Sequence, residues 1–137
     1  MLRSVLAIVI GFVVIGSLVG VTDLLMHSMF ADKFGPSGRV DDVGILVVTQ
    51  IYVFTYAVFG CYLCARIAER RPMFHALFLG ALGLILNIVA SYMTWQLWPA
   101  WYHIVALLAA VPAAWLGGWL RERQIEHRPL GLRGATA

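Results

Sequence analysis

Charged residues are scarce in this chain. Only 12% of its 137 residues are Asp, Glu, Lys or Arg, whereas 61% are hydrophobic. A water-soluble domain carries about twice this share of charge, and the basic residues here gather only beside apolar segments, without a basic face elsewhere. The composition therefore excludes a nucleic-acid-binding protein and indicates a membrane protein.

Cysteine is also scarce, and the sequence lacks the common motifs of metal-binding and catalytic sites. The chain has two cysteines, Cys61 and Cys64. It has no Cys/His cluster of zinc-site spacing, no glycine-rich phosphate loop and no Ser/His/Asp set. We therefore expect no metal, no cofactor and no enzymatic activity. The segment Cys61-Tyr62-Leu63-Cys64-Ala65-Arg66 resembles the redox pair of bacterial quinone-linked disulfide oxidases, which implies thiol chemistry, although that family needs a second pair that this chain lacks.

Long apolar runs fill almost the whole sequence. They cover residues 5–26, 44–65, 73–95 and 98–120. A spanning helix needs about 20 mainly apolar residues to cross about 30 Å of hydrocarbon, and the backbone of a segment in lipid must bond internally. The sequence therefore predicts an all-α integral membrane four-helix bundle, a single transmembrane domain over 1–137 with a disordered basic tail at 121–137.

The basic residues predict which way the helices cross the membrane. Cytoplasmic loops carry an excess of Lys and Arg. With the N-terminus inside, eight of the ten basic residues lie on the inner side, and only Lys33 and Arg39 lie outside. We therefore expect both termini in the cytoplasm. The inner set comprises Arg3, Arg66, Arg70, Arg71, Arg121, Arg123, Arg128 and Arg133.

Small residues mark the faces through which helices approach each other in lipid, because apolar side chains gain little by leaving it. They recur at helical spacing in the first, third and fourth runs, and we predict that they pack inside the bundle or against another protomer. The second run offers Tyr52, Tyr56 and Gly60 on one side. The candidate packing glycines are Gly16, Gly20, Gly80, Gly83, Gly117 and Gly118.

Asp23 is the most informative single residue. A carboxylate about one turn from the end of a span is costly unless it is paired, protonated or hydrated. His27 lies four residues later on the same helix face and can bond to it. Other polar residues fall in the outer half of the remaining spans, so that the sequence predicts a polar pocket open to the outside. The candidate set is Asp23, His27, Gln50, Asn87, Ser91 and His103.

Four segments carry a resemblance that covers nearly the whole chain. They are Thr22-Asp23, the run Arg70-Arg71-Pro72-Met73-x-His75-Ala76, Trp101-Tyr102 and the run Pro112-x-x-Trp115-Leu116-Gly117-Gly118. In these segments the chain resembles small four-span proteins of bacteria that have no assigned function. The resemblance implies a bacterial inner membrane and lends no activity.

Three hypotheses of different classes follow. The leading one is a structural or accessory membrane protein that lies in the lipid bilayer and packs with itself, as a homo-oligomer, or with a membrane partner protein. The alternative is a small proton-coupled transporter or channel that uses Asp23. The third is a thiol-redox membrane enzyme at Cys61 and Cys64.

Overall fold

Four long helices make up most of the protein. The computed structural model describes residues 2–35, 38–68 and 71–127, and no strand occurs among them. Each long helix is long and apolar enough to cross a membrane, which confirms the predicted all-α membrane architecture. In chain order the elements are α1 Leu2–Met29, the short 3-10 helix η1 Ala31–Lys33, α2 Val43–Ile67, α3 Pro72–Met93 and α4 Ala100–Glu126.

Local signals set where α2 and α3 begin. The Asp42 carboxylate accepts a hydrogen bond of 3.1 Å from the N–H of Ile45, which satisfies one of the free donors in the first turn of α2. Pro72 opens α3, because the N–H that proline lacks has no partner in a first turn anyway.

The end of α4 differs from the sequence-based expectation. We predicted disorder from residue 121, but the helix continues to Glu126. Two contacts hold the extension: the Tyr62 hydroxyl donates to Gln124 at 2.8 Å, and the Arg123 guanidinium lies 4.2 Å from the ring centroid of Trp119. The remainder of the predicted tail, 128–137, lies outside the described residues.

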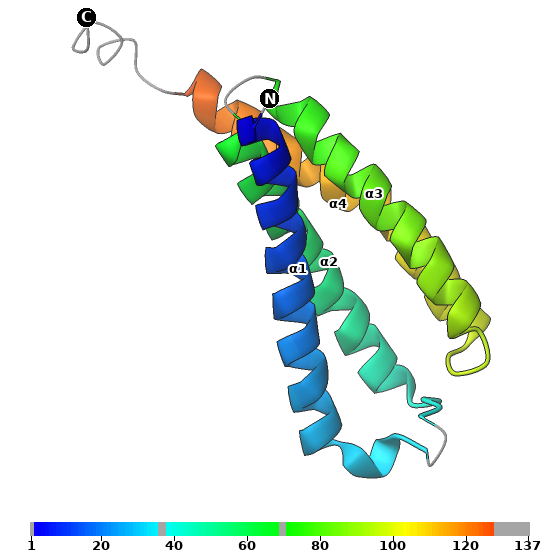
Figure 1. The fold of residues 1–137 in the computed structure, drawn as a ribbon. Coiled ribbons are helices and arrows are strands. Elements are labelled where there is room, and N and C mark those ends of the chain that lie inside the picture. Colours follow the sequence, from blue (N-terminus) through cyan, green and yellow to red (C-terminus); the bar gives the residue numbers. More distant parts are fainter. Residues whose placement is uncertain (1, 36–37, 69–70, 128–137) are drawn as a thin grey trace, which may run out of the picture.

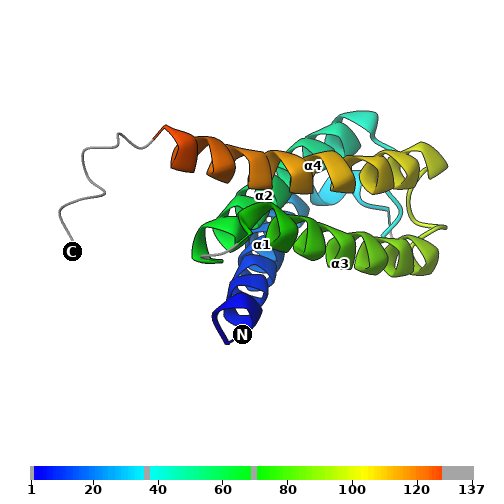
Figure 2. The same cartoon turned by 90° about the horizontal axis from the view of Figure 1, so that it is seen from above.

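The helices are arranged as two hairpins that share an extensive contact between α2 and α4 (Figure 1). The pair α3 and α4 leans away from α1 toward the end that carries the loops after α1 and α3. Seen from above, α3 and α4 run alongside each other and cross the direction of α1 (Figure 2). Helix α1 packs mainly against α2 and touches α3 much less, so a large part of its surface is free of other helices.

The two ends of the bundle are different in character. We call the end with the start of α1 and the end of α4 the proximal end, and the end with residues 30–35, 38–42 and 94–99 the distal end (Figure 1). A buried cluster around Ala7, Cys64 and Leu79 packs the proximal half. At the distal end, the N–H of Val40 donates to the carbonyl of Leu97 at 3.1 Å and thereby joins the two interhelical loops.

Candidate functional site

Two hydrogen bonds join polar side chains of α1 to tyrosines of α2. The Tyr52 hydroxyl donates to the Asp23 carboxylate. The hydroxyls of Thr22 and Tyr56 lie 3.1 Å apart. Because a carboxylate in an apolar environment needs such a partner, Asp23 fastens α1 to α2.

The partner of Asp23 differs from the expected one. His27 is exposed, and its ring stacks on Phe34 with the ring centroids 3.7 Å apart. No hydrogen bond or ion pair joins His27 to Asp23 in the part of the chain that the structure describes. The predicted bond between Asp23 and His27 is thus replaced, because the loop after α1 folds back onto the imidazole ring while α2 supplies the hydroxyl donor.

Asp23 lines a cavity at the distal end, which we call the distal cavity. Its volume is about 230 Å³, and its walls come from α1, the first loop, α2, Trp98 before α4 and Tyr102 in the first turn of α4. Asp23 is the only one of the described lining residues that carries a formal charge when histidine is neutral. The aromatic side chains in the walls are His27, Phe34, Tyr52, Trp98 and Tyr102.

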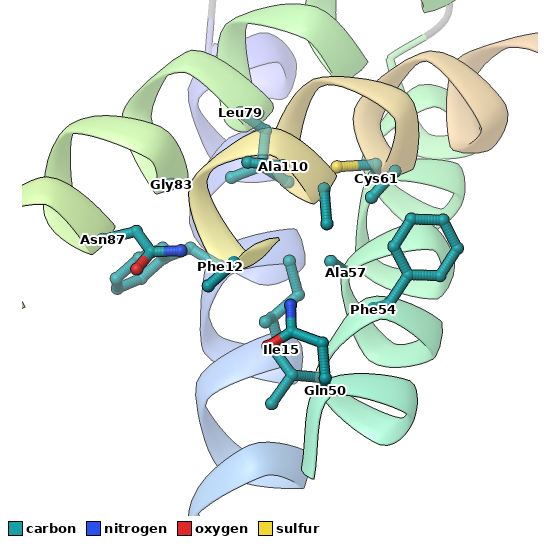
Figure 3. Close-up of a pocket in the computed structure, with 15 residues that line it drawn as sticks. Phe12, Ile15, Gln50, Phe54, Ala57, Cys61, Leu79, Gly83, Asn87 and Ala110 are labelled. Carbon is teal, nitrogen blue, oxygen red and sulfur yellow. The ribbon is translucent and has the colours of Figure 1, made fainter. Parts of the chain in front are cut away.

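A second cavity, the central cavity, lies among all four helices and has a volume of about 160 Å³. Figure 3 shows the side-chain amides of Gln50 on α2 and Asn87 on α3 in a wall that is otherwise mainly apolar. The Oε1 atom of Gln50 is buried and has no hydrogen-bond partner among the described residues. The Asn87 Oδ1 atom accepts a bond of 3.4 Å from the Ser91 hydroxyl. Such amide groups suit an ordered water molecule.

The single polar pocket that the sequence predicted is therefore divided between two cavities. Asp23 and His27 line the distal cavity, whereas Gln50 and Asn87 line the central one. The reason lies in the rotation of α2: Gln50 and Tyr52 are two residues apart, so their side chains leave the helix about 200° apart. Tyr52 faces Asp23 of α1, and Gln50 faces the central cavity.

His103 lines neither cavity. It is 1% exposed, its ring stacks on Trp95 with the centroids 5.0 Å apart, and the ring of Trp98 lies at a centroid distance of 5.8 Å. Its Nε2 atom has no hydrogen-bond partner among the described residues. The structure thus places His103 in the aromatic packing of the distal end rather than beside Asp23.

Sequence reasoning did not place the aromatic walls in the site. Tyr52 was assigned to a face of the second run, and Trp98 and Tyr102 were not connected with Asp23. A signal existed, because all of these residues lie near the same end of their runs as Asp23. The position of a residue along its run does not show which helix faces meet, so this signal could not predict which of these residues contact Asp23.

The basic residues of the distal end are paired away from Asp23. The Lys33 ammonium lies 2.5 Å from Asp42, and Arg39 lies 3.0 Å from Asp41. The hydrogen bond to Asp42 raises the pKa of Lys33. The hydrogen bond from Lys33, together with the N–H of Ile45, lowers the pKa of Asp42. Neither cation is among the residues that line the distal cavity, and each is paired with a carboxylate other than that of Asp23.

Three of the six candidate packing glycines lie against neighbouring helices. A Cβ on Gly117 would lie 2.7 Å from the backbone oxygen of Val58, which leaves no room for a side chain. Gly80 faces Ala114, and Gly118 faces Met73. These contacts bring α4 close to both α2 and α3.

The other three candidates do not contact a neighbouring helix closely: Gly16 and Gly20 are exposed on α1, and Gly83 lines the central cavity. Apart from the adjoining backbone of the same helix, no atom of the described residues lies within 4 Å of the place where a Cβ would stand on these three glycines. The close approach of α1 to α2 occurs instead at Gly11, where a Cβ would lie 3.0 Å from the oxygen of Gly60. The small pair Ala7 and Gly11, four residues apart, could have revealed this contact.

The two cysteines lie in the proximal core. Cys61 and Cys64 are free and buried, and the Cys64 thiol donates to the His75 carbonyl at 3.6 Å. They pack there as small residues with apolar neighbours. No group of three or more His, Cys, Asp or Glu side chains suited to a metal ion occurs among the described residues. Thiol-redox activity stays a prediction.

Comparisons with known proteins add no assignment. No family model, no curated protein and no solved structure matches this chain. The function is therefore argued below from the helix contacts and the two cavities.

Proposed function

We propose that the chain is a structural or accessory protein of a bacterial inner membrane, without enzymatic activity, that assembles with a second copy of itself. The observation that supports this most is the use of the polar side chains of α1 for helix contacts: Asp23 bonds to Tyr52, and Thr22 bonds to Tyr56. Polar side chains that are satisfied by a neighbouring helix hold a bundle together in lipid.

The distribution of basic residues supports a cytoplasmic proximal end. Helix α1 starts and helix α4 ends at that side (Figure 1), and Lys33 and Arg39 belong to the distal loop. Because basic residues are retained on the cytoplasmic side, the distal cavity then faces the outside. The basic residues described at the proximal end are Arg3, Arg66, Arg71, Arg121 and Arg123.

The free face of α1 supports self-association. Gly16 and Gly20 are exposed and four residues apart, the spacing that lets two helix backbones approach closely. A second copy can present the same pair to the first, so that the same surface serves both partners.

The oligomeric state tests the proposal. The protein in mild detergent should be larger than a monomer by light scattering, and Gly16→Leu combined with Gly20→Leu should shift it to the monomer with its helix content unchanged. Gly83→Leu is the control, because a Cβ on Gly83 also meets no neighbouring helix, but Gly83 lies on α3 beside the central cavity and away from the free face of α1. A wild-type monomer, or an oligomer that survives the double substitution, would contradict self-association through this face.

A second candidate function is ion-coupled transport at Asp23. It is favoured by the absence of any Lys or Arg among the described residues that line the distal cavity, since a carrier carboxylate must change its charge during a cycle. In liposomes, Asp23→Asn should then abolish solute-coupled proton flux while the protein stays folded. Equal flux in wild type and variant, or none in either, would exclude this candidate.

A further inference from the structure

We infer that the distal cavity binds a small organic monocation of the quaternary ammonium class, with Asp23 as its counter-ion and aromatic rings as its walls. The inference goes beyond the structural role proposed above and does not rest on it. It concerns binding at one cavity, whether or not the protein self-associates.

The charge of the cavity is the first argument. The described lining residues include one carboxylate, that of Asp23, and no Lys or Arg. The two basic residues of the distal loop are engaged with Asp41 and Asp42. Tyr52 donates to one oxygen of Asp23, and no other hydrogen bond to Asp23 occurs among the described residues. A carboxylate beside apolar walls attracts a cation because its charge is otherwise unbalanced.

The chemistry of the walls is the second argument. The rings of Trp98 and Tyr102 lie edge to face with centroids 5.3 Å apart, and the rings of His27 and Phe34 are stacked. Each ring of these pairs is supported by another, so the walls are ordered before a ligand arrives. Aromatic faces attract cations, tryptophan most strongly, and rings of this kind are the usual surroundings of quaternary ammonium groups.

Size and donor set distinguish an organic cation from a metal ion. A metal ion would need several oxygen, nitrogen or sulfur ligands, and no suitable group of three such side chains occurs among the described residues. A cavity of about 230 Å³ exceeds one of about 150 Å³ that accepts benzene. A quaternary ammonium group fills such a space and has no N–H groups that need acceptors. His27, which is exposed, marks the side where the cavity meets the surroundings.

The test compares choline with its neutral carbon isostere, dimethylbutanol, by calorimetric titration of the purified full-length protein in detergent. We expect saturable binding of choline and no saturable binding of the isostere. Sodium chloride, titrated at the same ionic strength as the choline salt, should give no binding signal. Asp23→Asn should weaken choline binding about tenfold or more, since the Coulombic attraction is lost. Asp41→Asn, which removes an exposed loop carboxylate outside the cavity, should bind choline like wild type.

A second pair of variants keeps the test decisive if Asp23→Asn does not fold. Trp98→Leu removes the ring and should weaken choline binding, whereas Trp98→Phe keeps a ring and should weaken it less. Equal binding of choline and isostere, or unchanged choline binding in both Asp23→Asn and Trp98→Leu, would overturn the inference. A loss of self-association with intact choline binding would contradict only the proposed structural function.

A competition experiment distinguishes a lipid headgroup from a free solute as the source of the ammonium group. A short-chain phosphatidylcholine below its micelle concentration carries the same group as a lipid headgroup. If it displaces choline, the cavity takes a headgroup from the membrane. If it does not, the cavity takes a free solute, and either result requires the cation site inferred here.

Discussion

The hydroxyl of Tyr52 on α2 donates a hydrogen bond to the carboxylate of Asp23 on α1, and both residues line the distal cavity. This pair of side chains thus joins two helices and holds the one carboxylate among the described residues that line the cavity. Stability and the inferred cation binding both involve the Asp23 carboxylate. Stability depends on the hydrogen bond from Tyr52, whereas cation binding also depends on the aromatic ring of Trp98.

Removal of the Tyr52 hydroxyl should destabilise the protein. Tyr52→Phe leaves the Asp23 carboxylate without its donor beside apolar walls, so we expect the free energy of unfolding to fall by about 1–3 kcal/mol. Thermal unfolding in detergent measures this. Tyr92→Phe is the matched control, because Tyr92 is 86% exposed and should lose nothing. An equal effect of the two substitutions would show that the hydrogen bond to Asp23 is not responsible.

Gly117 and Gly83 should respond in opposite ways to the same substitution. Gly117→Ala places a methyl group against the backbone of α2, and overpacking of this kind costs about 1–3 kcal/mol. Gly83→Ala meets open space and should stabilise α3 by up to about 1 kcal/mol through helix propensity. Melting temperatures of both variants in the same detergent check the difference in sign.

The cysteines should be dispensable for chemistry. Cys61→Ala combined with Cys64→Ala should keep the oligomeric state and the helix content of wild type, with only a modest fall in melting temperature from the lost sulfur contacts. Thiol titration of the unfolded wild-type protein should find both thiols free. A native disulfide between Cys61 and Cys64, or a change in it that depends on added quinone, would instead favour the redox hypothesis.

The pair of Lys33 and Asp42 should make the start of α2 sensitive to pH at both extremes. The lowered pKa of Asp42 means that its contribution is present above the ordinary value of 3.8 and is lost as the pH falls through its folded value. The raised pKa of Lys33 means that its contribution is present below 10.5 and is lost as the pH rises through its folded value. Melting temperature against pH should show both slopes, and Asp42→Asn should flatten them, whereas Asp41→Asn should retain them.

Topology can be measured directly. Reporter fusions at Ala137 and between Gly35 and Gly38 should report cytoplasm and periplasm respectively, because eight of the ten basic residues then lie inside. A periplasmic signal at Ala137 would contradict the proposed orientation. Signals on both sides would indicate dual topology, which the charge distribution disfavours.

The helices were predictable because length and apolar composition are visible in the sequence. Their ends were less predictable, since they depend on contacts between distant residues. The extension of α4 to Glu126, for example, is accompanied by the bond between Tyr62 and Gln124 and by the contact of Arg123 with Trp119. The sequence of residues 121–126 by itself does not predict these contacts.

The site was less predictable than the fold, because a helix in lipid can be apolar on every side. In a soluble protein the apolar stripe shows which face turns inward, but α2 carries apolar residues all around, so the sequence did not show that Tyr52 faces Asp23 while Gln50 faces a separate cavity. The same ambiguity affects glycines: Gly117 and Gly16 both stand among apolar residues, yet a Cβ on the first would meet the backbone of α2, and a Cβ on the second would meet no neighbouring helix among the described residues.

The bond between Val40 and Leu97 has a consequence for the order of biosynthesis. A chain is made from its N-terminus, so α1 and α2 can form their contact through Asp23 and Tyr52 before α4 exists. The N–H of Val40 can bond to the Leu97 carbonyl only after residue 97 has been synthesised. The distal cavity is likewise complete only after Trp98 and Tyr102 have been synthesised. During synthesis the carboxylate is therefore fixed early, and its aromatic enclosure is completed only when the last helix is inserted.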